Sequence, residues 1–341
     1  MKRGLLRGTL LAVALAVAGM VPATAGADGL PVLGVSAGPE GVPAEAGDVR
    51  YVNLPAHGNT VVARVEQNGG RVLESAFLPG GFAVPVVAFD GSASGLSTDG
   101  NTLVLIRPRA TFPRAKTSFA VLDAERLRLR ELVTLRGDFS FDALSPDGDL
   151  LYLIEYVAPH DPTRYVVRAY DISAGRLLRG PIVDPREPDE AMRGYPITRA
   201  TSPNGRWAYT LYDGAGGHPF VHALDTRERS AACIDLHALA GRQDLYDLRL
   251  AVSADGESFS VMDGSNALAL VDASTFEVAE PAEPAPPLRP ESVTPSSAPS
   301  PRVEASAPGG GPPWLLAGAA GGGILLALAL LAVLRRRMYA A

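Results

Sequence analysis

One four-residue turn motif recurs four times along the chain and constrains its fold more than any other feature. The motif reads Ser-x-Asp/Asn-Gly and stands at residues 97–100, 145–148, 202–205 and 253–256. Asp-Gly and Asn-Gly pairs adopt the positive φ angles of tight hairpin turns. Each copy precedes a run of aliphatic, β-branched and aromatic residues, which is typical of a half-buried strand. The sequence therefore predicts repeated β-hairpins.

A second turn, built on an aspartate, recurs between the copies of the first. Asp123, Asp171, Asp225 and Asp272 each end an apolar run and precede several turn-forming residues. An aspartate at this place closes a hairpin, because its carboxylate accepts hydrogen bonds from backbone amides shortly after it. The serines of the four motif copies are separated by 48, 57 and 51 positions, which is the spacing of propeller blades.

Each of the four units divides into four antiparallel strands, and we expect a shorter, three-stranded unit before them at residues 50–73. Four-stranded meanders around a central axis form the blades of a β-propeller. The expected fold class is all-β, a propeller of about five four-stranded blades over residues 49–280. A Pro-rich stalk and one transmembrane helix are expected after it.

The repeat also carries a family resemblance. Ser-Pro-Asp-Gly followed by an apolar strand, as at residues 145–156, resembles the repeat of TolB-like and Tyr-Val-Thr-Asn-type propellers, and the resemblance covers residues 49–280. It implies a propeller and no particular function. TolB-like proteins carry an additional N-terminal α/β domain and stay soluble in the periplasm. The sequence shows neither feature, so Tol-system partners are not implied.

Both ends of the chain have the composition of targeting segments. Residues 1–27 join basic residues to an apolar run and then to small residues, the layout of a secretory signal peptide. Residues 314–334 carry no charge, and their length suffices to cross a hydrocarbon core of about 30 Å. The basic tail 335–341 is expected in the cytoplasm by the positive-inside rule. The sequence thus predicts a single-pass plasma-membrane protein with its propeller outside.

Two further segments are expected to lack packed structure. Residues 28–48 are rich in Gly, Pro and Ala and are interpreted as a flexible lead-in. Residues 281–313 contain 11 prolines and are interpreted as a stalk. Within the predicted span, Gly318 and Gly322 form a G-x-x-x-G pattern, which pairs helices in some membrane proteins and occurs without pairing in others.

Charge and composition indicate which partners are excluded and what kind of organism encodes the protein. Six of the 31 basic residues lie in the two terminal segments, whereas all 37 acidic residues lie between them, which leaves a net charge of −12 there. Such a surface repels nucleic acid. Lys2 and Lys116 are the only lysines, and Ala, Gly, Pro and Arg are abundant. This composition is typical of high-GC bacteria, and we expect an actinobacterial source.

The histidines do not form a metal-binding pattern in the sequence. They stand at His57, His160, His218, His222 and His237. His218 and His222 are four residues apart, but Pro219 and the strand after it remove the helical face that would bring them together. Asp235 and His237 are interpreted as a surface pair on one strand face. Because zinc needs three or four convergent ligands, the sequence predicts no metal site.

Other chemical motifs lack the setting that they need. Residues 34–38 match the hydrolase pattern G-x-S-x-G, but no strand precedes and no helix follows them. The glycine-rich stretches 214–217 and 309–311 lack the strand-to-helix setting of a phosphate loop. Cys233, the single cysteine, is interpreted as a small buried residue in a strand. We expect no catalytic residue and no cofactor.

The side of the propeller opposite the tight turns remains as the place for function. Its connections are long and variable, and binding usually resides in such loops. The candidate binding residues there are Arg107, Arg109, Phe112, Arg114, Lys116, His160, Asp161, Arg186, Tyr195 and His218. Solvated loops without a ligand are the alternative at each position.

The sequence therefore predicts a non-enzymatic, membrane-tethered propeller scaffold that binds a protein or cell-envelope ligand through its long loops. The alternative is a propeller enzyme of hydrolase, lyase or quinoprotein type with its site at the central channel. Three or more His, Asp, Glu or Arg side chains converging at the channel mouth would favour the enzyme.

Overall fold

The computed structural model describes residues 41–44, 47–68, 70–188 and 192–279. The predicted signal peptide, most of the lead-in, the stalk, the membrane span and the tail lie outside these residues, and so do Gly318 and Gly322. No helix within the described ranges is long and apolar enough to cross a membrane.

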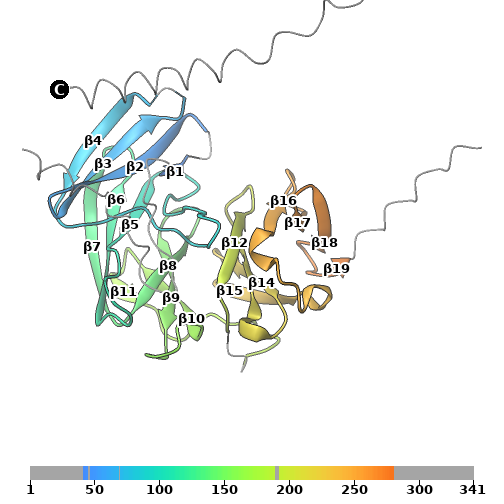
Figure 1. Ribbon diagram of the computed structural model, residues 1–341. Helices are drawn as coiled ribbons and strands as arrows, with labels where there is room; N and C mark the ends of the chain where they lie inside the picture. Colours follow the sequence, from blue (N-terminus) through green and yellow to red (C-terminus); the bar gives the residue numbers. More distant parts are fainter. Residues whose placement is uncertain (1–40, 45–46, 69, 189–191, 280–341) are drawn as a thin grey trace, which may run out of the picture. The chain divides into compact units, whose positions relative to one another are not determined.

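Five antiparallel sheets in chain order make up the described chain (Figure 1). Sheet 1 contains β1 (Val42–Pro43), β2 (Val49–Ala56), β3 (Asn59–Glu66) and β4 (Val72–Leu78). Sheet 2 contains β5 (Thr102–Ile106), β6 (Lys116–Asp123) and β7 (Arg128–Arg136). Sheet 3 contains β8 (Phe139–Leu144), β9 (Leu150–Tyr156), β10 (Tyr165–Asp171) and β11 (Arg176–Leu177).

The remaining strands form two further meanders with short 3₁₀ helices in their connections. Sheet 4 contains β12 (Pro196–Thr201), β13 (Trp207–Tyr212), β14 (Phe220–Asp225) and β15 (Ser230–Asp235). Sheet 5 contains β16 (Arg249–Val252), β17 (Ser258–Asp263), β18 (Asn266–Asp272) and β19 (Val278–Ala279). The 3₁₀ helices are η1 (Gly214–Gly216), η2 (His237–Leu239) and η3 (Leu245–Asp247).

The repeated motif forms the predicted tight turns, and its serine has a role that the sequence did not reveal. In all four copies the serine Oγ donates to the Asp or Asn side chain two residues on, at 2.5–2.8 Å. The same oxygen accepts the backbone N–H five residues on, at 2.9–3.0 Å. Each serine therefore joins the turn to the strand that follows it, and the predicted hairpins are confirmed.

The five sheets agree with the predicted number of blades, but the shorter unit is a different one. Sheet 1 has four strands because Val42–Pro43, inside the expected lead-in, pairs with β2. Sheet 2 has three named strands, and its expected first strand makes a single bridge from Leu96 to Leu103. Gly95 has a φ of 113°, which interrupts the extended backbone at this point.

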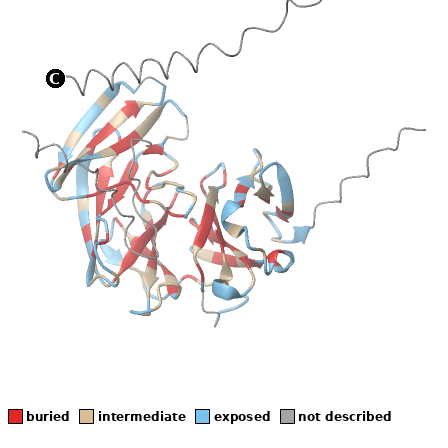
Figure 2. Ribbon diagram, viewed as in Figure 1, coloured by how far each residue is buried: buried red, intermediate tan, exposed pale blue. Residues whose placement is uncertain are grey.

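Consecutive sheets pack on each other through four hydrophobic clusters. These clusters join sheets 1 and 2, 2 and 3, 3 and 4, and 4 and 5. Every residue of β5 and β8 is buried, whereas β4 and β7 are largely exposed (Figure 2). Sheets that are buried along one edge strand and exposed along the other are arranged as the blades of a β-propeller.

The tight turns of different sheets touch one another. The Asp99 amide donates to the Pro146 carbonyl at 3.0 Å, which joins the turns of sheets 2 and 3. Gly205, in the turn of sheet 4, packs directly against Thr98, in the turn of sheet 2. The contact is so close that a Cβ on Gly205 would collide with the Thr98 side chain. We call this side, with the Ser-x-Asp/Asn-Gly and aspartate turns, the turn face, and the opposite side the loop face.

Candidate functional site

Two of the candidate binding residues on the loop face, Arg109 and Arg114, make internal hydrogen bonds that stabilise the fold. Arg109 is 4% exposed, and its guanidinium donates to Asp138 at 2.7–3.1 Å. Asp138 also accepts from the Arg114 amide at 2.8 Å. Arg114 donates in addition to the carbonyl of Arg107 at 2.7 Å and to Thr117 Oγ1 at 3.0 Å. These arginines connect sheets 2 and 3 within the protein.

Most other candidate residues lie at the surface of the loop face. Lys116 and His160 are exposed, and Arg107 lies over the Phe82 ring at 5.1 Å. Phe112 packs edge-on against the ring of Tyr156, with the ring centroids 5.5 Å apart.

Asp161 and Arg186 make local contacts in their loops. The Asp161 carboxylate accepts from the Thr163 amide at 3.0 Å, which closes a turn. Arg186 pairs with the buried carboxylate of Asp184 at 2.6 Å. The Asp184–Arg186 pair also binds β15, because the Cys233 amide donates to Asp184 at 2.9 Å and Arg186 donates to the Cys233 carbonyl at 3.0 Å. The two remaining candidates, Tyr195 and His218, belong to an aromatic cluster and a histidine cluster at the surface.

The first cluster consists of three aromatic rings and is here called the aromatic cluster: Phe89, Tyr195 and Tyr246. The Phe89 ring meets the Tyr195 and Tyr246 rings edge-on, at centroid distances of 6.0 and 5.7 Å. Phe89 is 47% exposed and Tyr246 is 45% exposed. The rings come from three connections, those that precede β5, β12 and β16, so they meet through folding alone.

The aromatic cluster is held in place by polar contacts. The Phe89 amide donates to the Pro196 carbonyl at 3.0 Å, which ties the connection between sheets 1 and 2 to sheet 4. The Tyr246 hydroxyl donates to the Asp213 carboxylate at 3.0 Å. Burial, followed by the charge of Asp213, raises the pKa of Tyr246, so this hydroxyl keeps its proton and remains a donor.

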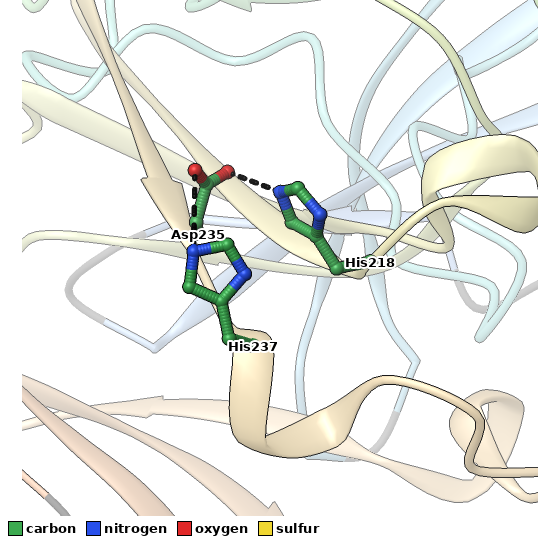
Figure 3. A group of neighbouring side chains, drawn as sticks. All are labelled: His218, Asp235 and His237. Atoms are coloured by element: carbon green, nitrogen blue, oxygen red, sulfur yellow. Dashed lines mark ion pairs between the residues drawn. The ribbon is translucent and has the colours of Figure 1, made fainter.

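The second cluster joins two histidines to one aspartate (Figure 3). His218 Nε2 lies 2.9 Å from one carboxylate oxygen of Asp235, and His237 Nε2 lies 3.9 Å from the other. The two imidazole centroids are 4.4 Å apart. We call these three residues the His-Asp-His group.

A cavity of about 170 Å³ opens beside the His-Asp-His group. Its lining residues are Met192, Arg193, Gly214, Gly217, His218, Phe220, Cys233 and Asp235. Cys233 lies in a strand, as the sequence predicts, but it is half-buried at this cavity rather than enclosed in the core.

A polar cluster lies between sheets 3 and 4. Arg199 on β12 donates to the backbone carbonyl of Asp142 at 3.0 Å and also pairs with the Asp142 carboxylate. His222 on β14 is 1% exposed, and its Nε2 makes no hydrogen bond to any described residue. Burial lowers the pKa of His222 to about 4, so its imidazole is neutral near pH 7.

A further cavity lies on the turn face, between sheets 4 and 5. It measures about 500 Å³ and is lined by the turns at 202–207, 255–257 and 272–274. Trp207 contributes the aromatic surface, but its ring already packs against Phe276 and lies beneath the Arg206 guanidinium. These lining residues belong to the repeated turns, which have a structural role in every sheet.

Sequence reasoning found part of the loop-face site and missed the rest. Tyr195 and His218 are among the predicted candidates, and each belongs to one of the two clusters. Asp235 and His237 form the predicted surface pair, at 3.9 Å, but they do not share a strand face, because His237 lies in η2. The sequence does not predict the participation of His218. Phe89 and Tyr246 carry no motif, and their proximity to Tyr195 has no signal in the sequence.

Comparisons with known proteins give structural likenesses alone. No family model matches the chain, and no curated protein matches it. Hydrazine synthase of Kuenenia stuttgartiensis is similar with a TM-score of 0.36 and 14% identity, over 69% of this chain and 77% of that chain. The Cps50 (Swd1) β-propeller domain of Myceliophteria thermophila is similar with a TM-score of 0.41 and 11% identity, over 69% of this chain and 67% of that chain.

A functionally unknown protein from Desulfotomaculum acetoxidans is similar with a TM-score of 0.38 and 11% identity, over 67% of this chain and 78% of that chain. Likenesses at this level carry no inference about what this protein binds or catalyses.

Proposed function

We propose that this protein is an extracytoplasmic, membrane-tethered propeller of TolB-like type that binds a protein or cell-envelope ligand through its loop face. The aromatic cluster is the observation that carries the proposal. Aromatic side chains are enriched in protein interfaces and dominate their binding energy. Phe89 and Tyr246 expose nearly half of their surface on the loop face.

The aromatic cluster is also organised before any ligand arrives. The Phe89 backbone is hydrogen-bonded to β12, and the Tyr246 hydroxyl is hydrogen-bonded to Asp213. Side chains that are already ordered lose little conformational entropy on binding, so more of the contact energy appears as affinity. Arg249 donates to the Tyr246 carbonyl at 3.1 Å, and its half-exposed side chain supplies a polar rim beside the rings.

The tether is part of the same proposal and rests on the sequence. The signal peptide at 1–27 would direct export and be removed, and the apolar segment at 314–334 would anchor the propeller outside the plasma membrane of an actinobacterium. The intervening stalk at 281–313 would span up to about 100 Å if it adopts polyproline II, at about 3.1 Å per residue. This length would present the propeller well away from the membrane surface.

Catalysis at the channel is the alternative, and the charges near the inner strands favour binding over it. Asp138 and Asp142 lie just before and within β8, and each is paired with an arginine. A carboxylate held in an internal ion pair is less available for acid and base catalysis than an unpaired one.

Site-specific photo-crosslinking tests the binding proposal in the native host. A photoreactive phenylalanine analogue replaces Phe89 in the full chain, and the matched control carries it at Ser274, an exposed residue of the turn face. We expect the Phe89 position to capture a discrete species that the Ser274 position does not. The F89S/Y246S double variant should weaken binding of the identified species by about tenfold or more.

Two outcomes would contradict the proposal. Equal crosslinking from both positions would show that the loop face is not selective, and no crosslink from Phe89 would remove the aromatic cluster as a contact. Protease treatment of intact cells tests the tether separately, because a propeller that faces outward is cleaved and one that faces inward is protected.

A further inference from the structure

We infer that the His-Asp-His group binds one divalent transition-metal ion of the zinc class, with an open coordination position beside the cavity of the loop face. The inference stands on the three side chains and their scaffold. It does not depend on the proposed ligand of the aromatic cluster.

The ligand atoms already converge. One atom from each of His218, Asp235 and His237 can be chosen so that all three lie within 4.8 Å of one another. Tetrahedral zinc with bonds of about 2.0–2.1 Å requires ligand atoms about 3.3 Å apart. His218 Nε2 lies 2.9 Å from one carboxylate oxygen of Asp235, and His237 Nε2 lies 3.9 Å from the other oxygen. Rotation of the Asp235 carboxylate and of the exposed His237 side chain would bring one atom from each residue to the spacing that an ion requires.

The backbone fixes the three ligands relative to one another. Phe220 at the start of β14 pairs with Asp235 at the end of β15. The Leu236 amide donates to the Pro219 carbonyl at 2.9 Å, which joins the residue after Asp235 to the residue after His218. Leu236 is 1% exposed and anchors the start of η2, from which His237 projects.

The donor set selects the class of metal. Two imidazole nitrogens and one carboxylate oxygen suit zinc and neighbouring transition metals, whereas calcium and magnesium prefer six or more oxygen ligands. Three protein ligands leave one position of a tetrahedral ion for water or an exogenous ligand, as in catalytic zinc sites rather than structural ones.

The surroundings allow an ion to enter and leave room for a fourth ligand. The side chains of His218 and Asp235 are 40% and 39% exposed, and that of His237 is 74% exposed. The adjacent cavity of about 170 Å³ has Arg193 in its lining. It has room for a few waters, each occupying about 30 Å³ in the liquid, or for a small anionic oxygen donor.

Metal titration of the purified full chain, stripped with a chelator, tests the inference. We expect Zn²⁺ to bind with a stoichiometry of one in competition with a chromophoric chelator, and millimolar Mg²⁺ or Ca²⁺ not to displace it. The variants H218A, D235N and H237A should each lower the Zn²⁺ affinity about tenfold or more. H160A is the matched control, because His160 is an exposed loop-face histidine outside the group.

A second readout separates coordination from a merely structural effect. Co²⁺ bound to the unmodified protein should give the visible absorption of a four-coordinate site, and D235N should abolish it. The melting temperature of each metal-free variant should equal that of the unmodified protein, because the three side chains are substantially exposed. The inference is overturned if the unmodified protein binds Zn²⁺ no more tightly than D235N, or if H160A loses as much affinity as H218A.

Discussion

The two faces of the propeller differ in the kind of contact that forms them. On the turn face, the same hydrogen bonds recur in four copies, and each joins residues that are no more than five positions apart. On the loop face, each cluster occurs once and joins residues from separate connections, as Phe89, Tyr195 and Tyr246 do. Repetition therefore marks structure on the turn face, whereas the candidate sites are exposed clusters of the loop face that occur once.

The loop face is itself divided into a structural and an exposed part. Arg109 and Asp138 are buried in one ion pair, whereas the aromatic cluster and the His-Asp-His group face solvent. The contrast between the faces thus makes quantitative predictions for single substitutions.

The largest expected effect lies in the structural part of the loop face. The R109M variant removes the main partner of the buried Asp138 carboxylate and leaves it with Arg114, whose Nε lies 3.2 Å away. Breaking a buried pair costs about 3–5 kcal/mol of the free energy of unfolding, and we expect a loss near the lower end of that range because Arg114 remains. Urea unfolding of the full chain measures the loss. K116M, at an exposed position on the same face, should change the free energy by about 0.5 kcal/mol or less. If R109M and K116M lose the same free energy of unfolding, the loop face does not have separate structural and exposed parts.

The next effect tests the contact between turns. The G205A variant forces a side chain onto a residue with a φ of 67° and drives its Cβ into Thr98. The left-handed backbone costs about 1–2 kcal/mol and the overpacking about 1–3 kcal/mol.

Gly100 is the matched control for this contact. It occupies the same motif position with a φ of 74°, but an added Cβ would meet no atom within 4 Å. G100A should therefore incur the backbone cost alone, and the difference between the two variants in thermal or urea unfolding measures the packing between turns. If G100A and G205A lose the same stability, the turns do not touch in solution.

The smallest of the three effects is a pH dependence from the interior between the faces. Burial lowers the pKa of His222 from 6.5 to about 4. As the pH falls from 6.5 toward 4, the unfolded chain binds a proton at His222 that the folded protein does not, so stability falls by about 3 kcal/mol at most. Above pH 6.5 this contribution is constant.

The turn-face aspartates do not obscure this pH window. The Ser274 hydroxyl and neighbouring amides lower the pKa of Asp272 to about 2, and the Ser253 hydroxyl lowers the pKa of Asp255 below 3.8. The stability that these carboxylates contribute is lost mainly below pH 4. Unfolding measured between pH 6.5 and 5 should thus show a slope that H222Q removes and H160Q retains. A slope unchanged in H222Q would contradict the assignment.

Much of the fold could be predicted from the sequence because the turns are local. The Ser-x-Asp/Asn-Gly and aspartate turns form at every predicted position, and their strands pair in the expected order. Two strands differ from the prediction: one additional strand in sheet 1 and an interrupted first strand in sheet 2. Val42–Pro43 pairs although its composition resembles a loop, and Gly95 interrupts the first strand of sheet 2.

Little of the candidate site could be predicted, because its members share no motif and lie far apart in the chain. Arg109 looks like a surface arginine in the sequence, and only its ion pair with Asp138, 29 residues later, makes it structural. Phe89 and Tyr246 become neighbours through two long connections that no short-range pattern links.

The sequence by itself determined the repeated hairpins, since the hydrogen bonds that form them close within five residues and depend on residue types alone. The tertiary structure decided which polar and aromatic side chains are buried and which converge. His218 meets Asp235 and His237 because β14 pairs with β15 and the Leu236 amide binds the Pro219 carbonyl. That convergence depends on strand register and on packing between elements, and neither is encoded in the spacing of the histidines.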